Sequence, residues 1–321
     1  MKQYGVSSNI EMDRLGELSY RFIAHLIGLL MGFESLLLCS CCCVSLIYGE
    51  KDMMSFVISF AICMSASALL MVIGQKKKSA ISRYEGYIVV GLSWVFFTIF
   101  GMLPYLIGGY IPSVTDAFFE TMSGFTTTGA TILDNIESMP HGILFWRSLT
   151  QWIGGLGIVF FTIVLMPGFG ASSQMLYLSE ATGVTHNKLY PKTRVMARYI
   201  FVVYILLTAI ESVLLKIGGM SLYDAICHSM TTTATGGFST KQESIAYWHS
   251  SYIEYVVSGF MLLSAINFSL YIVACKGGWK QIWKNAELKW FTCSVGVLTF
   301  IITAALIQNN NYGIEEAIRK S

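Results

Sequence analysis

The sequence predicts an all-α integral membrane protein built from a repeated unit, in which a helix, a short re-entrant helix with an extended strand, and a second helix follow one another. Three observations support this fold class. The 321 residues are 54% hydrophobic and only 12% charged, which is more apolar surface than one soluble core can bury. Several apolar stretches reach the roughly 20 residues that a helix needs to cross a bilayer. A polar stretch rich in threonine and glycine lies between two such segments and occurs twice.

Seven apolar stretches qualify as membrane-spanning helices. Lipid offers the backbone no hydrogen-bond partners, so a spanning segment must satisfy its own polar groups, as a helix does. The first stretch is long and lacks a small-residue cleavage pattern, which indicates a retained span and not a signal peptide. The expected spans are residues 22–48, 54–74, 87–108, 143–166, 199–217, 252–275 and 290–307.

The basic residues indicate the orientation of these spans. If the N-terminus is cytoplasmic, most of the 21 lysine and arginine side chains fall in cytoplasmic segments. These residues are Lys2, Arg14, Arg21, Lys76, Lys77, Lys78, Arg83, Lys188, Lys192, Arg194, Arg198, Lys276, Lys280, Lys284 and Lys289. The positive-inside bias therefore predicts a multi-pass protein with a cytoplasmic N-terminus, and both Thr/Gly stretches open to the outside.

The Thr/Gly stretch from Asp116 to Thr131 returns at Asp224 to Ser239. Each stretch begins with an amphipathic segment that is too short to cross the membrane at 1.5 Å per residue, so we expect a helix that enters it only part-way. The C-terminal end of such a helix carries partial negative charge, which favours a cation. Aligning the two stretches requires no gap and pairs Met122 with Met230, Thr127 with Thr235 and Gly129 with Gly237.

The segments that follow the two short helices, 126–131 and 234–238, supply backbone carbonyls with little side-chain bulk. A row of carbonyl oxygens can replace the water shell of a dehydrated alkali cation, as in potassium filters. Glycine permits the dihedral angles that turn neighbouring carbonyls toward one axis. The repeated unit is therefore interpreted as a potassium-channel-like pore helix and filter strand. An ordinary re-entrant or extracellular polar loop is the alternative.

Charged side chains inside the spans are further candidates. Glu34 and Glu211 are intramembrane acids, which suggest function by default because burying a charge in lipid is costly. For Glu34, a structural partner and a wet crevice both stay open. Arg147, near the outer end of the fourth span, could neutralise Glu120 or snorkel to the interface.

Other polar or small residues in these segments are interpreted as packing residues. His228 is expected to be buried and hydrogen-bonded, because no second metal ligand lies near it in the sequence. The glycines at 154, 155 and 157 are expected to let helices approach closely. The eight cysteines lack the paired spacing of a zinc site and mostly lie in spans, where they act as small apolar residues.

Four motifs carry a resemblance to a known family. They are Glu85-Gly86 leading into Trp94 and Gly101-Met102-Leu103-Pro104; Phe119 to Thr131; Arg147 and Gln151 through Gly157; and Thr233 to Thr240. Together they resemble the TrkH/KtrB/HKT superfamily of potassium transporters, in particular its TrkH branch, over the chain from about residue 84 onward. The additional N-terminal hairpin is also similar to the TrkH arrangement.

The resemblance implies which carbonyls bind the ion. Gly129 and Gly237 match the filter glycines of the family, and a glycine at the first position is similar to the potassium-permeable members. The implied filter carbonyls are those of Thr127, Thr128, Gly129, Ala130, Thr235, Gly236, Gly237 and Phe238. Potassium is expected at Thr127, Thr128, Thr235 and Gly236.

The resemblance also implies a domain organisation, an activity and partners. The parts are a tail and two-helix hairpin (1–83), a first helix, pore loop and helix unit (84–170), a second such unit with a preceding cytoplasmic loop (171–285), and the beginning of a third unit (286–321). The implied activity is potassium uptake across a bacterial inner membrane, without a cofactor. Implied partners are the lipid bilayer, a second copy of the chain when full length, and a cytoplasmic nucleotide-binding subunit of TrkA type. No nucleic-acid partner is expected.

Three other interpretations of the sequence compete with a potassium transporter. The family builds its pore from four units, whereas two are recognisable here, so the sequence is either a fragment or a truncated reading frame. A sodium-permeable relative and a non-conducting assembly or regulatory half-protein therefore stay open. An intramembrane enzyme using Cys227 or His228 would lack a convincing nucleophile, base and orienting group. No P-loop or dinucleotide fingerprint occurs in the sequence, so nucleotide hydrolysis by this chain is not expected.

We expect that the 321-residue product by itself does not conduct potassium selectively, because two units leave part of the ion's coordination shell without carbonyls. The measurement is growth at low potassium of cells that lack potassium uptake systems and any full-length homologue. Growth that depends on expression of this chain would contradict the expectation.

Overall fold

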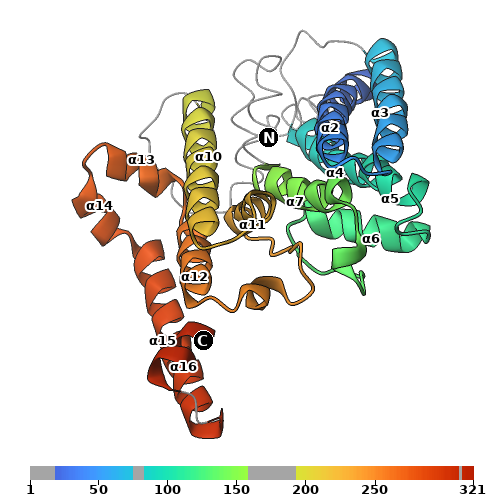
Figure 1. Ribbon diagram of the computed structural model, residues 1–321. Helices are drawn as coiled ribbons and strands as arrows, with labels where there is room; N and C mark the ends of the chain where they lie inside the picture. Colours follow the sequence, from blue (N-terminus) through green and yellow to red (C-terminus); the bar gives the residue numbers. More distant parts are fainter. Residues whose placement is uncertain (1–18, 75–82, 158–192, 311–312) are drawn as a thin grey trace, which may run out of the picture. The chain divides into compact units, whose positions relative to one another are not determined.

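The computed structural model describes residues 19–74, 83–157, 193–310 and 313–321 (Figure 1). These residues form helices joined by turns and extended segments, and no β-strand occurs among them. The described residues fall into two compact units, one ending at Met122 and the other beginning at Ser123. Each unit is described by itself. The all-α fold class predicted from the sequence is confirmed.

The first unit begins with a helical hairpin of α2 (Tyr20–Tyr48) and α3 (Met53–Ile73). Helix α2 ends at Gly49, whose φ of 65° lies in the left-handed region that glycine adopts without strain. The two helices pack closely because Gly28 of α2 leaves room for α3, and the Ser67 hydroxyl donates to the Gly28 carbonyl at 2.6 Å. The hairpin expected at the N-terminus is therefore confirmed.

Glu34 lies inside this hairpin with 1% of its surface exposed. Its Oε2 atom lies 3.8 Å from the Cys63 thiol, which is a weak donor, and its Oε1 atom has no hydrogen-bond partner among the described residues. Of the two interpretations left open for Glu34, this contact favours a structural partner.

The rest of the first unit is α4 (Arg83–Gly101), α5 (Leu103–Ile107) and the beginning of α6 (Val114–Phe125). Helices α4 and α5 meet at Met102, and the apolar stretch from Glu85 to Ile107 is long enough to span a membrane. The short helix predicted to begin near Asp116 is α6, with 12 residues. At 1.5 Å per residue it is about 18 Å long, which is too short to cross the hydrocarbon core.

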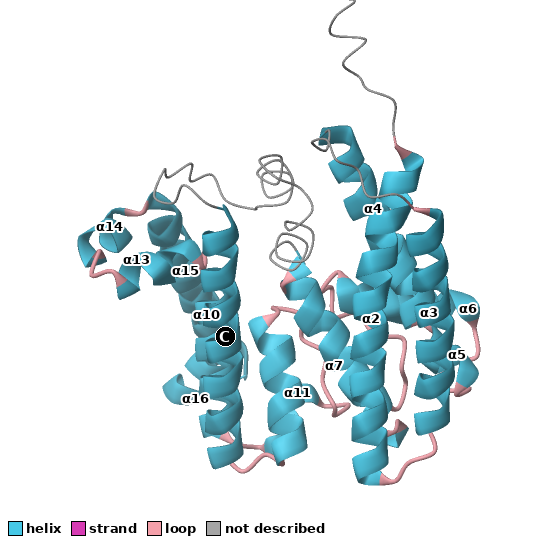
Figure 2. Ribbon diagram, turned by 90° about the horizontal axis from the view of Figure 1, so that it is seen from above, coloured by secondary structure: helices cyan, strands magenta, loops and turns pink. Residues whose placement is uncertain are grey.

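The second unit contains the end of α6 and eight further α-helices of the described chain. The order is α7 (His141–Gly155), α10 (Thr193–Ile217), α11 (Leu222–Thr233), α12 (Ser251–Ala265), α13 (Ser269–Cys275), α14 (Trp279–Lys284), α15 (Ala286–Asn310) and α16 (Ile314–Lys320). Two 3-10 turns, η1 (Ile136–Ser138) and η4 (Ser244–Trp248), follow the two Thr/Gly segments. Figure 2 shows α10 and α11 side by side, and the two helices pack against each other.

An apolar cluster joins α10, α11 and α12 in the second unit. Its buried residues are Leu215, Met220, Ala225, Ile253 and Val257. Van der Waals packing in this cluster anchors the short helix α11 between two longer helices.

Five described helices are long and apolar enough to cross a membrane, and they correspond to five of the expected spans. They are Tyr20–Tyr48, Met53–Ile73, Glu85–Ile107, Ala197–Ile217 and Ala286–Gln308. The expected span at 143–166 begins in α7 and continues into residues outside the described ones. Several basic residues expected on the cytoplasmic side, at positions 2, 14, 76–78, 188 and 192, also lie outside the described residues.

The span expected at 252–275 is sharply bent in the structure. Helices α12 and α13 occupy this stretch, but they meet at an angle of 96°. The break has a local cause: Ile266 is extended, and the Asn267 side chain accepts hydrogen bonds from the backbone N–H and the hydroxyl of Ser269, which starts a new helix.

The chain ends with a helix that packs against α12. Arg319 of α16 pairs with Glu254 of α12, and the Tyr255 hydroxyl donates to Glu315 at 3.0 Å. The short helix expected to begin near Glu315 is therefore confirmed.

Candidate functional site

The two short helices α6 and α11 end in the same hydrogen-bond pattern. In α6, the backbone N–H of Thr127 donates to Gly124 at 3.0 Å, and that of Thr128 donates to Ser123 at 2.9 Å. In α11, the N–H of Thr235 donates to Thr232 at 2.8 Å, and that of Gly236 donates to Thr231 at 2.9 Å. Both pairs of bonds form a Schellman motif, which satisfies the last carbonyls of a helix and turns the chain away from its axis.

The backbone dihedrals after the two helices also repeat. Thr127 and Gly129 have φ values of 52° and 76°, and the aligned residues Thr235 and Gly237 have φ values of 54° and 83°. A left-handed threonine is unusual, because its branched Cβ crowds the backbone, and such a residue costs on the order of 1–3 kcal/mol. The segments predicted to repeat from sequence alone therefore share one strained backbone conformation.

The two extended segments lie against each other in the second unit. A Cβ atom added to Gly129 would collide with the carbonyl oxygen of Gly236, so the two backbones approach more closely than any side chain at residue 129 would allow. Had Gly129 and Gly237 been far apart, no shared ion path would be conceivable. We call the segments 126–131 and 234–239 the two filter strands, after the role that the family resemblance predicts for them.

Helix α7 supports the ends of both short helices through its glycines. A Cβ on Gly154 would collide with the carbonyl oxygen of Phe125 at the end of α6. A Cβ on Gly155 would lie only 2.9 Å from the Cα atom of Ala234, directly after α11. The interpretation of these two glycines as packing residues is confirmed.

Arg147 on α7 is 1% exposed, so the expectation that it snorkels to the interface is wrong. Its Nη1 atom donates to the carbonyl oxygen of Ser239 at 3.0 Å, and its Nη2 atom donates to Oγ1 of Thr131 at 3.2 Å. The guanidinium carbon lies 4.2 Å from the centre of the Phe238 ring. Neutralisation of Glu120 by Arg147 would join the two units, and it stays a prediction.

Gln151, one helical turn after Arg147, contacts the second filter strand. The backbone N–H of Phe238 donates to its Oε1 atom at 3.0 Å, and the side chain fills the space that a Cβ on Gly236 would need. Its Nε2 atom is buried without a hydrogen-bond partner among the described residues. From the sequence, Gln151 is only part of a motif and has no predicted role. Its hydrogen-bond partner is the backbone N–H of Phe238, which is distant in sequence and so gives no local signal.

His228 on α11 is buried and hydrogen-bonded, as expected from the sequence. Its Nδ1 atom lies 2.8 Å from the carbonyl oxygen of Asp224, and its Nε2 atom lies 3.0 Å from the hydroxyl of Ser239. The ring contacts Trp248 edge-on at 5.0 Å between ring centres. Asp224 also holds the second strand, because its carboxylate accepts from the Thr240 hydroxyl at 2.6 Å.

The first filter strand is tied to its own helix by a bond that the sequence analysis missed. The Ser123 hydroxyl donates to the carbonyl oxygen of Ala130 at 2.6 Å. The hydrogen bond uses one of the two lone pairs of this carbonyl oxygen, so Ala130 stays in the expected filter set. The only hint of this hydrogen bond in the sequence is a serine near the end of a short helix. A serine at such a position has many possible partners, so the bond to Ala130 could not be predicted.

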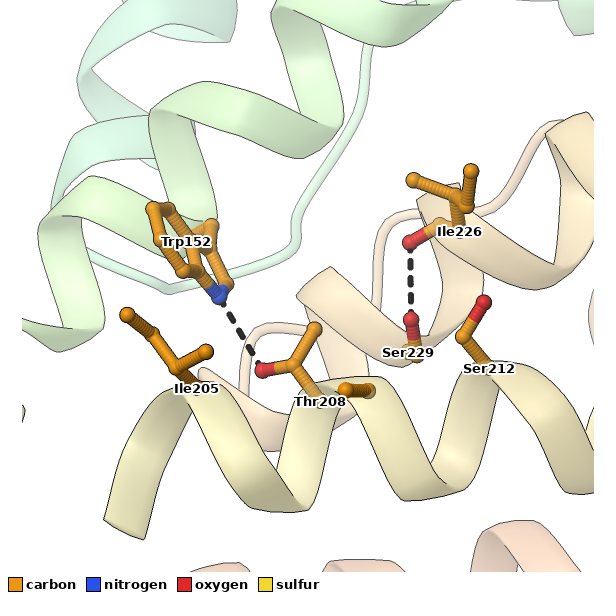
Figure 3. A pocket seen from close by; sticks show the side chains of 7 residues that line it. Trp152, Ile205, Thr208, Ser212, Ile226 and Ser229 are labelled. Atoms are coloured by element: carbon orange, nitrogen blue, oxygen red, sulfur yellow. Dashed lines mark hydrogen bonds between the residues drawn. The ribbon is translucent and has the colours of Figure 1, made fainter. Parts of the chain in front are cut away.

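A separate cavity of about 280 Å³ lies between α7, α10 and α11 (Figure 3). It is lined by Trp152, Ile205, Thr208, Ala209, Ser212, Ile226 and Ser229. Several of its polar side chains are hydrogen-bonded: the Trp152 indole donates to Thr208 at 3.1 Å, and the Ser229 hydroxyl donates to the Ile226 carbonyl at 2.9 Å. None of the eight expected filter residues lines this cavity. It is therefore distinct from the candidate ion site.

Glu211, the second intramembrane acid, is fully buried beside the end of α11. Its Oε2 atom accepts from the Thr233 hydroxyl at 3.4 Å, and its Oε1 atom has no partner among the described residues. Thr233 lies two residues before the left-handed Thr235, so Glu211 contacts the base of the second filter strand and not the strand itself.

Comparison with known proteins defines the class. A family model described as a cation transport protein, TrkH, matches residues 52–308. The chain belongs to the TrkH family.

The relatives are bacterial potassium uptake proteins. The Trk system potassium uptake protein TrkH of Escherichia coli K12 is 34% identical over 296 residues, which cover 91% of this chain and 61% of that protein. TrkG of the same organism is 36% identical, with 84% of this chain and 56% of TrkG covered. The crystal structure of the potassium transporter TrkH from Vibrio parahaemolyticus matches with a TM-score of 0.80 at 32% identity, over 94% of this chain and 62% of that one. The chain thus spans about three fifths of the length of TrkH relatives.

Gly154→Ala tests the close packing of α7, and Gly91→Ala is its matched control. Both glycines lie in helices, but only the Cβ at residue 154 would collide with a backbone carbonyl. We expect Gly154→Ala to destabilise the protein by about 1–3 kcal/mol, whereas Gly91→Ala is neutral or stabilising by up to about 1 kcal/mol. Thermal unfolding in detergent measures both. Equal melting temperatures for the two variants would contradict the packing.

His228→Gln tests the buried histidine. Burial lowers the pKa of His228, because the charged imidazolium loses its hydration. The unfolded chain therefore binds this proton at higher pH than the folded chain. The resulting stability is present above the unfolded pKa of about 6.5 and is lost as the pH falls below it. We expect the melting temperature to fall less steeply with acidification in His228→Gln than in the wild type. Parallel plots of melting temperature against pH would show that His228 does not contribute to the pH dependence of stability.

Proposed function

We propose that this chain takes part in potassium uptake across a bacterial inner membrane, with dehydrated K⁺ held by backbone carbonyls of Thr127–Ala130 and Thr235–Phe238. The observation that carries the proposal is the repeated left-handed pair, Thr127 with Gly129 and Thr235 with Gly237, in two strands that touch. Left-handed residues at alternate positions allow successive carbonyls to face one side, which extended backbone does not.

The electrostatics of the site support a cation. Helices α6 and α11 both end directly before a filter strand, and the C-terminal end of a helix carries roughly half a negative charge. Carbonyl oxygens and threonine hydroxyls then supply neutral ligands that can replace the hydration shell of an alkali ion. The relatives are potassium uptake proteins, which agrees with this chemistry.

The partners follow from the same proposal. The transported ion is K⁺, and the chain uses no resident cofactor and has no enzymatic activity. In the full-length protein, two copies pair in the membrane, and a cytoplasmic nucleotide-binding subunit of TrkA type regulates transport. The N-terminus lies in the cytoplasm, and the filter strands open to the periplasmic side.

The test uses all 321 residues joined to the part of E. coli TrkH that the chain does not cover. Expressed in cells without potassium uptake systems, this fusion is expected to restore growth at low potassium and to take up rubidium in preference to sodium. Gly129→Ser is expected to lower that preference roughly tenfold, since a shift of the strand costing about 1.4 kcal/mol in ion discrimination has this effect.

Gly109→Ser is the matched control, because Gly109 also has positive φ but lies outside the filter strands with open space around its Cα atom. It should leave the preference unchanged. A fusion that reaches the membrane without taking up rubidium would overturn the proposal, and equal uptake of sodium and rubidium would favour a sodium-permeable relative.

A further inference from the structure

Arg147 contacts the same position in both repeats. Its two donor contacts are Thr131 and Ser239, which are the aligned last residues of the two repeated stretches. The two acceptors belong to different filter strands. One guanidinium group therefore links the strands at equivalent points, directly after the proposed ion ligands Ala130 and Phe238.

The geometry of the contact suits an arginine. The planar guanidinium group presents several N–H donors in a fixed fork, so it can serve two acceptors in set directions, whereas a lysine ammonium is a single flexible point. Arg147 is 1% exposed, and a buried cation is tolerated only when its donors are used. The Phe238 ring adds a cation–π contact at 4.2 Å.

Ser239 is held from a second side. Its carbonyl oxygen accepts from Arg147 of α7, while its hydroxyl lies 3.0 Å from Nε2 of His228 on α11. The hydroxyl also accepts from the backbone N–H of Lys241 at 2.9 Å. The peptide group that follows Ser239 is thus held by α7, and the Ser239 side chain is held by α11.

We infer that Arg147 is a positioning residue that braces the two filter strands against each other and thereby sets the discrimination between K⁺ and Na⁺. This inference rests on the proposed function. Discrimination in a carbonyl filter depends on the spacing and the field strength of the oxygens around the ion. A brace between strands fixes that spacing, and its loss lets each strand relax separately.

Thr131→Val and Thr131→Ser form the decisive pair of variants. Valine keeps the branched shape of threonine but cannot accept from Arg147 or from the backbone N–H of Leu133, which also donates to the Thr131 hydroxyl oxygen at 3.2 Å. Serine keeps the acceptor oxygen for both donors. Thr131 is exposed, so neither change disturbs the core. Substituting Arg147 directly risks misfolding because the side chain is buried.

The first readout is hydrogen exchange of the full 321-residue chain in lipid nanodiscs. Thr131→Val is expected to speed exchange roughly tenfold in the other strand, at the amides of residues 237–241, because a hydrogen bond to a charged donor is lost. Thr131→Ser is expected to match the wild type. The proposed link between the strands would be wrong if Thr131→Val speeds exchange only in the first strand, or if Thr131→Val and Thr131→Ser exchange at the same rate. This conclusion holds whatever the transport measurement shows.

The second readout is the rubidium-to-sodium preference of the fusion protein described above. Thr131→Val is expected to lower the preference while rubidium uptake persists, and Thr131→Ser is expected to retain it. Coupled exchange with an unchanged preference would overturn the role in discrimination. If the unaltered fusion takes up no rubidium, the proposed function fails, and with it the role of the brace in ion selection.

Discussion

The close approach of α7 to the ends of α6 and α11 is the constraint on which the site depends. Gly154 and Gly155 lie where any larger residue would meet the backbone at Phe125 and Ala234. Extended backbone at membrane depth survives only when protein surrounds it, because lipid cannot satisfy its polar groups. Helix α7 packs against the strands and satisfies some of their polar groups. Its Arg147 and Gln151 lie on the same helical face and hydrogen-bond to the backbone of the second strand.

Strain and support occur together in the filter strands. Thr127 and Thr235 adopt a left-handed conformation that threonine disfavours, and two of the four non-glycine residues with positive φ in the described chain are these threonines. Such a conformation persists only where neighbouring contacts hold it in place. The Schellman bonds of each helix end and the side chain of Gln151 provide those contacts.

Much of the fold could be predicted because its signals are local. Five of the seven spans predicted from the apolar stretches correspond to described helices long enough to cross a membrane. The gapless repeat placed Thr127 and Thr235 at positions that share one backbone conformation. The bend near Asn267 was missed because the stretch 252–275 is mostly apolar and long enough to span a membrane, although asparagine is a residue type that starts helices. Arg147 was singled out, but one of its acceptors lies 92 residues away and is a backbone carbonyl, which no periodicity can indicate.

The duplicated strands do not have duplicated scaffolding. Helix α12 follows the second strand as α7 follows the first, yet its 15 residues, SYIEYVVSGFMLLSA, include no arginine, lysine or glutamine. The internal symmetry of the backbone is therefore broken at the level of side chains. A displacement of α7 would reach both strands together, because its Arg147 donates to Thr131 in one and to Ser239 in the other.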